Sequence, residues 1–155
     1  MFILPKDKAG NKSRNQSDCW EAYQEYLLSV SGRLPASAYD FASAEWHYNF
    51  LDHRCPHDAW VESITIYEDS IGDRSEIRQL HIKTTLLGAY HDGYIEIVHI
   101  DVKKYRINSD SFVHGDWLYD EVRLGDDGAV VHEIEFSKAN LYVECSDIRS
   151  LWVPK

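Results

Sequence analysis

The chain has 155 residues, and its 26 acidic side chains outnumber 16 basic ones to give a formal net charge of −10. This length fits one domain, and a hydrophobic content of 44% excludes an intrinsically disordered chain. An acidic surface repels phosphate backbones, and no segregated basic face is evident in the sequence. We therefore expect no nucleic-acid partner.

Targeting and redox signals point to the cytoplasm. The apolar stretch at residues 1–4 is too short for a signal peptide, and no apolar run approaches the roughly 20 residues that span a bilayer. The three cysteines are an odd number without Cys-x-x-Cys spacing, which indicates neither a disulfide framework nor a zinc knuckle. We expect a cytoplasmic protein with no membrane partner and no cofactor.

The chain opens with a basic segment that two helices follow. Residues 1–17 carry four basic side chains and one acidic side chain, so we interpret them as a mobile arm and assign 18–155 to a single domain. Asp18 and Glu21 fit a capping box, and apolar residues at helical spacing predict a helix over 18–31. Pro35 and a second apolar stripe predict another helix that ends near Trp46.

From residue 58 onward the hydrophobic pattern alternates, which is typical of strands. We expect strands near 59–67, 76–87, 94–107, 117–124, 129–136 and 141–145. The links between them are short and rich in Gly and Asp, and short links favour antiparallel neighbours because a parallel crossover needs a dozen or more residues. The predicted fold class is therefore α+β, with two N-terminal helices packed on a twisted, mostly antiparallel sheet of about six strands.

One loop gathers potential metal ligands between the second predicted helix and the first predicted strand. Imidazole, thiolate and carboxylate groups suit zinc, and the candidates are His53, Cys55, His57 and Asp58, with His47 or His91 as further ligands. Their spacing matches no zinc signature, and Pro56 constrains the loop. The alternative interpretation is a loop in which His57 and Asp58 make hydrogen bonds to the backbone at the strand entry.

Three histidines precede acidic residues closely enough to suggest general-base chemistry: His91-Asp92, His114-Gly115-Asp116 and His132-Glu133. Adjacent strand residues point to opposite faces, so His132 and Glu133 should not pair, and the first set fits a hairpin turn. No nucleophile or phosphate-binding motif is present. We interpret His132 as a hydrogen-bonded core residue and lean against an enzyme.

Aromatic content is high, with five Trp and ten Tyr, and both residue types are enriched at protein interfaces. One segment interleaves aromatic and acidic residues, which would suit a basic protein partner. The predicted partner-binding residues are Asp116, Trp117, Tyr119, Asp120 and Glu121, with Asp126 and Asp127 of the adjacent hairpin tip. The interpretation requires Trp117 or Tyr119 to be exposed.

Residues 57–136 also carry a family resemblance. It rests on His57-Asp58-Ala59-Trp60-Val61-Glu62-Ser63-Ile64, on Leu86-Leu87-Gly88-Ala89-Tyr90-His91-Asp92-Gly93-Tyr94-Ile95-Glu96-Ile97, and on Val102 and Tyr105. This stretch resembles small bacterial proteins that include predicted immunity proteins of polymorphic toxin systems. The resemblance implies a protein that binds and neutralises a toxin, and it transfers no catalytic residue. The acidic composition favours a basic toxin as the partner. The alternative function is a small metal-dependent hydrolase or metal-binding protein that uses the His53/Cys55/His57/Asp58 loop.

Overall fold

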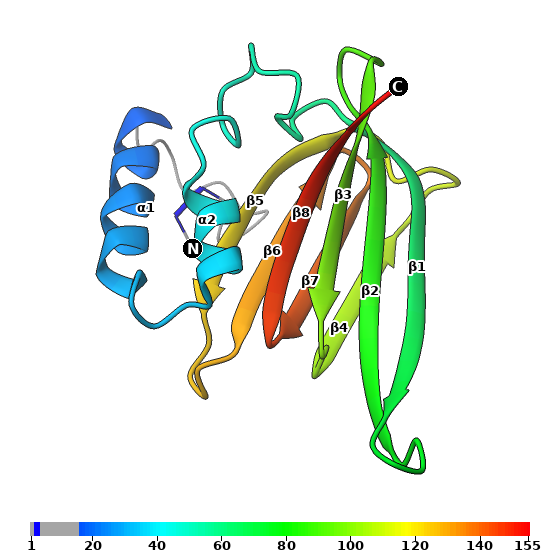
Figure 1. Cartoon of the computed structure of the whole chain (residues 1–155). Coiled ribbons are helices and arrows are strands. Elements are labelled where there is room, and N and C mark those ends of the chain that lie inside the picture. Colours follow the sequence, from blue (N-terminus) through cyan, green and yellow to red (C-terminus); the bar gives the residue numbers. More distant parts are fainter. Residues whose placement is uncertain (1, 4–15) are drawn as a thin grey trace.

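The computed structural model describes residues 2–3 and 16–155 (Figure 1). The predicted mobile arm over 1–17 lies mostly outside the described residues. Its described part, Phe2 and Ile3, is half-buried, and the Phe2 ring stacks on Tyr26 with ring centroids 4.9 Å apart. The start of the chain therefore contacts the first helix.

Two helices form the N-terminal part of the domain, as predicted. Helix α1 spans Gln16–Val30 and α2 spans Ala36–Ser43. Because α1 begins before Asp18, this residue lies in the first helical turn and is not the predicted N-cap. The helices bury Tyr23, Leu27 and Val30 of α1 and Ala38, Phe41 and Ala42 of α2, which follow the i, i+3, i+4, i+7 spacing of an amphipathic helix.

Within the described residues, a loop follows α2 and leads into eight antiparallel strands, which form two sheets. The strands are β1 Trp60–Ile71, β2 Ile77–Leu87, β3 Gly93–Ile100, β4 Lys104–Ser109, β5 Trp117–Leu124, β6 Val130–Phe136, β7 Ala139–Cys145 and β8 Asp147–Pro154. One sheet has the order β1-β2-β3-β8 and the other has the order β4-β7-β6-β5. The α+β class and the antiparallel pairing are confirmed, whereas the single sheet of about six strands is split into two.

The predicted long strand over 94–107 is wrong because the chain changes sheets inside it. Asp101 has a φ of 51°, a left-handed conformation that an extended strand does not contain. Its carboxylate accepts hydrogen bonds from Lys103 and from Ser146, whose backbone N–H also donates to the carbonyl of Ile100. Ser146 is the second crossing point, because it links β7 in one sheet to β8 in the other. The two points at which the chain changes sheets, Asp101 and Ser146, are therefore neighbours that hydrogen bonds join.

Strand β8 has no counterpart in the sequence prediction. It pairs with β3 over its whole length, from Ile100↔Asp147 to Gly93↔Pro154. Only Ile148 of β8 is buried, so the strand shows no apolar alternation, and only one residue separates it from β7. Strand β8 is therefore marked in the sequence neither by alternating hydrophobic residues nor by a turn-forming segment before it.

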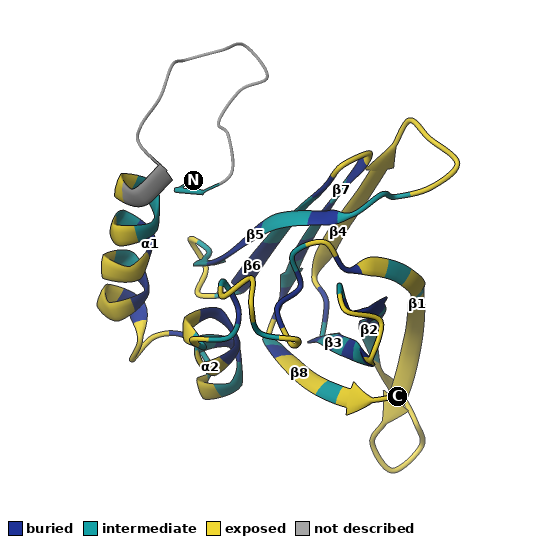
Figure 2. Cartoon of the chain, turned by 90° about the horizontal axis from the view of Figure 1, so that it is seen from above, coloured by how far each residue is buried: buried dark blue, intermediate teal, exposed yellow. Residues whose placement is uncertain are grey.

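The hydrophobic core lies between the two sheets and continues under the helices. Ile82 and Ile97 of one sheet and Ile134 and Leu141 of the other belong to the same buried cluster. Helix α2 packs against β8, and both helices lie at one side of the sheets (Figures 1 and 2). Figure 2 shows that β1 and the β4–β5 loop, on the side away from the helices, are largely exposed. In the described part of the chain, no helix is long and apolar enough to cross a membrane.

Helix α1 closes the free edge of β5. The Tyr23 hydroxyl lies 2.7 Å from the backbone nitrogen of Val122, whose N–H it accepts, and 3.1 Å from the carbonyl oxygen of the same residue. The Tyr26 hydroxyl accepts the N–H of Leu124 at 2.8 Å. Side chains therefore satisfy backbone groups that another strand would otherwise pair with, which protects this edge from aggregation.

Candidate functional site

The predicted partner-binding residues do not form one surface. Trp117, Asp120 and Glu121 are at most 1% exposed, so they cannot contact a partner of the folded domain. The sequence prediction assumed that β5 has a solvent face. In the structure, the core covers one face of β5, and the buried Glu121 carboxylate accepts backbone N–H groups of Phe2 and Ile3 on the other.

The other members of the predicted patch are separated from one another. Asp116 and Tyr119 are half-buried near the start of β5, and Tyr119 contacts the rings of Trp20 and His57. Asp126 and Asp127 are exposed in the turn between β5 and β6, at the other end of the strand. The acidic and aromatic residues are therefore not gathered as predicted.

The four candidate metal ligands of the loop also have separate partners. His53 pairs with Asp92 and stacks on Tyr90, and the Cys55 thiol donates to the carbonyl of His47 at 3.0 Å. Burial raises the pKa of Cys55 to about 11, which keeps it a thiol. His57 lies 3.3 Å from Asp58, its own neighbour. Among residues 2–3 and 16–155, no three His, Cys, Asp or Glu side chains are arranged to hold a metal ion.

A buried polar network connects the loop after α2 to both sheets. The Asp120 carboxylate lies 2.8 Å from Nε2 of His47 and 2.9 Å from Nε2 of His132, and it accepts the Trp117 indole N–H at 3.3 Å. His132 in turn lies 2.9 Å from His99 of β3. These histidines and Asp120 are at most 1% exposed. His132 is the hydrogen-bonded core residue that the sequence predicted.

His47 is held between two hydrogen-bond acceptors. Its Nδ1 lies 2.8 Å from the carbonyl oxygen of Phe41 and its Nε2 faces the Asp120 carboxylate. Burial raises the pKa of Asp120, but His47 and the hydrogen bonds from His132 outweigh it and hold that pKa well below its usual value. This buried ion pair is closed to substrates and supports the fold.

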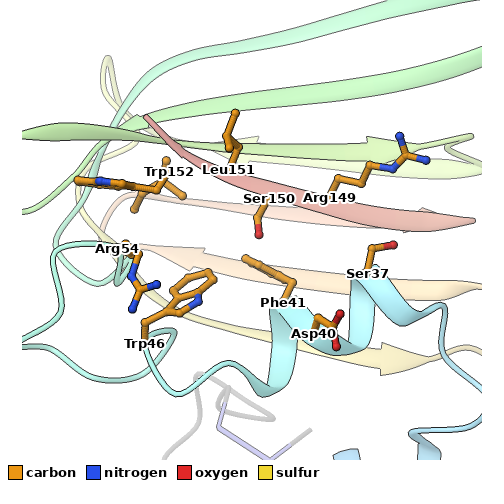
Figure 3. A pocket seen from close by; sticks show the side chains of 10 residues that line it. Ser37, Asp40, Phe41, Trp46, Arg54, Arg149, Ser150, Leu151 and Trp152 are labelled. Carbon is orange, nitrogen blue, oxygen red and sulfur yellow. The ribbon is translucent and has the colours of Figure 1, made fainter. Parts of the chain in front are cut away.

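A groove of about 510 Å³ lies between α2, the loop that follows α2, and β8 (Figure 3). Phe41 contributes from α2, Trp46 and Arg54 from the loop, and Arg149 and Trp152 from β8. In Figure 3, Trp46, Arg54 and Trp152 gather at one end of the groove and Arg149 lies toward the other. We call this surface the α2–β8 groove.

The two tryptophans of the groove, Trp46 and Trp152, pack against neighbouring residues. The Trp46 indole is nearly parallel to the His47 ring, at 8° and 5.5 Å between centroids, and the Arg54 guanidinium lies 5.7 Å from the Trp46 ring. The Trp152 indole packs on the β2–β3 hairpin, where a Cβ at Gly93 would overlap it. The buried network therefore supports one tryptophan and a glycine makes room for the other.

The groove offers aromatic surface and guanidinium groups. Arg54 makes two hydrogen bonds to Asp52, at 2.9 and 2.8 Å, which lower the pKa of that carboxyl group to about 2. Arg149 is exposed, and its Nε lies 4.0 Å from Asp147. Ser37 donates its hydroxyl to the same Asp147, and the lining contains no histidine to act as a base. The carboxylate of Asp40 also lines the groove.

Comparison with protein-family models, curated proteins and solved structures finds no match to this chain. The resemblance to immunity proteins thus remains a proposal, and the groove is interpreted from its own chemistry. Sequence reasoning missed the groove because its residues come from three separate segments. No local signal marks them, because Trp46 and Trp152 lie in segments that the packing of α2 against β8 brings together.

Proposed function

We propose that this chain is a protein-binding domain and that its partner docks on the α2–β8 groove. The observation that carries the proposal is the pair of half-exposed tryptophans, Trp46 and Trp152, together with Arg54 and Arg149 in one concave surface. Trp and Arg are the residue types that most often dominate the energy of a protein interface, and anchors that are already rigid lose little entropy on binding.

The net charge of −10 gives the partner a preferred character. An acidic protein attracts a basic one over long range and accelerates their encounter. Together with the resemblance over residues 57–136, this favours a cytoplasmic immunity protein that neutralises a basic toxin. The long-range field would bring the toxin close, and the groove would hold it.

The test is co-expression with each product of the open reading frames that flank the gene for this chain. If one product is toxic, the wild-type chain should restore growth, whereas a W46A/W152A variant should not. L28A is the matched control, because Leu28 is an exposed apolar residue of α1 outside the groove, and it should restore growth fully.

Binding measurements with the purified pair separate the two parts of the proposal. The double variant should bind at least about 2 kcal/mol more weakly through faster dissociation, and added salt should slow association of the wild type. Full rescue of growth by a folded W46A/W152A variant would exclude the groove as the binding site. No rescue of any toxic neighbour by the wild type would contradict the immunity role.

A further inference from the structure

The edge of β1 differs from the edges that helices adjoin. Tyrosine hydroxyls of α1 close the edge of β5, and α2 packs beside β8. Strand β1 is the longest strand, at 12 residues, and it ends its sheet. At its first residue, Trp60, it forms an isolated bridge to Asp116. Beyond this bridge, in the described part of the chain, no strand pairs with residues 61–71 on the outer side.

This edge lacks most of the devices that prevent strand addition. A bulge lies near its start, between Val61 and Ser63, but the register with β2 is unbroken from Ser63↔Thr85 to Ile71↔Ile77. The segment 63–71 contains no proline and no lysine, the residues that commonly protect an edge. Alternate residues of such a strand direct their N–H and C=O groups outward, ready to pair with another chain.

The outer half of the β1–β2 hairpin also extends beyond the third strand. Strand β2 pairs with β3 only from Ile82 to Leu87, so the part near the turn is two-stranded (Figure 1). Ile66, Ile71 and Ile77 are exposed there. A two-stranded hairpin is marginally stable by itself, and a third strand would bury these side chains and complete the ladder.

A hollow continues this edge at the Trp60 end. It has a volume of about 410 Å³ and is lined by Trp60 and Val61 of β1 and by residues 112–116 of the β4–β5 loop. Phe112 is fully exposed and Val113 is also exposed. An extended chain that lies along β1 would bring one of its side chains into this apolar hollow.

The acidic character of the β1 edge indicates which kind of segment could pair with it. Residues 60–76 contain five acidic side chains and one basic side chain, and Asp110 and Asp116 of the β4–β5 loop add two more carboxylates. A second copy of β1 fits poorly, because full antiparallel overlap would place Glu62 opposite Asp69, and like charges directly opposite each other are destabilising. Arg78 pairs with Glu68 and His81 faces Asp69 across the hairpin, but acidic side chains still outnumber basic ones here, so a basic segment would meet a net opposite charge.

We infer that the β1 edge takes up an extended, basic segment of a protein partner as an additional antiparallel strand. Its backbone would pair with residues 63–71, and an apolar side chain near its C-terminal end would enter the hollow between Trp60 and Phe112. This surface is distinct from the α2–β8 groove, and the inference does not depend on the function proposed for that groove.

The probe is a labelled peptide, acetyl-(Lys-Val)₄-Lys-Phe-amide, whose binding is followed by fluorescence anisotropy. Two further peptides carry N-methyl groups on alternate residues, in one frame or the other, and a fourth replaces every Lys with Glu. An added strand uses the N–H groups of only one frame. One N-methylated peptide should therefore bind at least tenfold more weakly than the parent while the other binds like it, and the Glu peptide should not bind.

Protein variants and hydrogen exchange locate the site. F112A should weaken binding of the parent peptide about tenfold, whereas L151A, which removes an exposed apolar side chain of β8, should leave it unchanged. Amide exchange should slow at alternate residues of 63–71 when the peptide is bound. Equal binding of both N-methylated peptides would show attraction by charge alone and would overturn the inference. Protection confined to β4 or β8 would overturn it as well.

Discussion

The Nε2 atom of His99 lies 2.9 Å from Nδ1 of His132, and this contact joins the two sheets inside the core. His99 belongs to β3 and His132 to β6, and both are fully buried. Because ionised Asp120 only accepts, His132 donates to it through Nε2, and its Nδ1 faces Nε2 of His99. A continuous chain of hydrogen bonds thus runs from one sheet through the other to the loop that carries His47.

Asp120 is the centre of this chain, and its removal should be costly. D120A leaves the buried His47 imidazole and the Trp117 indole N–H without their acceptor. Breaking a buried ion pair in this way typically costs about 3–5 kcal/mol in unfolding free energy. Urea denaturation at neutral pH measures the change. D126A is the control, because Asp126 is exposed in the β5–β6 turn, and it should unfold like the wild type. Equal stability of the two variants would contradict a structural role for the network.

His99 should make the domain sensitive to acid. The pKa of His99 is lowered from 6.5 to about 3, chiefly by burial and secondly by the nearby His132. Because the folded pKa lies below the unfolded one, the unfolded chain takes up the proton first, and stability is lost as the pH falls from 6.5 toward 3. Between pH 6 and 4 the wild type should lose about 1.4 kcal/mol per pH unit more than H99N. Urea denaturation of both proteins across this pH range tests the prediction. If the unfolding free energies of the wild type and H99N depend equally on pH, His99 is not the cause.

The sequence predicted those elements whose hydrophobic pattern has a single period. Both helices, β2 and β6 lie close to their expected positions because each presents an apolar face to the core. Strand β5 also matches its predicted range, although its consecutive residues Asp120, Glu121 and Val122 are all buried. The division into two sheets was not predictable, since it depends on the left-handed conformation of Asp101 and on its contact with Ser146, 45 positions further on.

The candidate site was harder to predict, because aromatic and acidic side chains look alike in a sequence whether they are buried or exposed. Trp117 and Asp120 were expected on the surface, yet they bond to each other in the core. Trp46 and Trp152 carried no distinguishing pattern, and they line one groove because α2 and the loop after it pack beside β8. Contacts between distant segments decide where Trp117 and Asp120 lie, and where Trp46 and Trp152 lie. Local hydrophobic periodicity contains no information about such contacts.

Tyr23 should protect the β5 edge as well as stabilise it. Y23F removes the hydroxyl that contacts both backbone groups of Val122 and leaves them unpaired in a buried position. An unsatisfied buried backbone group costs about 1–3 kcal/mol, so the unfolding free energy should fall by this amount. Y39F is a suitable control, since Tyr39 is a half-buried tyrosine of α2. Light scattering on heating should show earlier aggregation for Y23F than for Y39F, and identical curves would argue against protection of the edge.

Gly93 should be required for the position of Trp152. The Gly93 backbone is that of an ordinary strand residue, so alanine costs nothing there in conformation, but its Cβ would overlap the indole of Trp152. We expect G93A to lower the unfolding free energy by about 1–3 kcal/mol, as overpacking does, and to shift the tryptophan emission. In a W152F background the smaller ring leaves room, so the same substitution should cost much less, and this coupling can be measured by a double-mutant cycle. G32A is the backbone control, because a Cβ at Gly32 meets no atom within 4 Å, and its stability should be unchanged or slightly raised. An equal cost of G93A with and without the indole would mean that Gly93 serves the hairpin and not the groove.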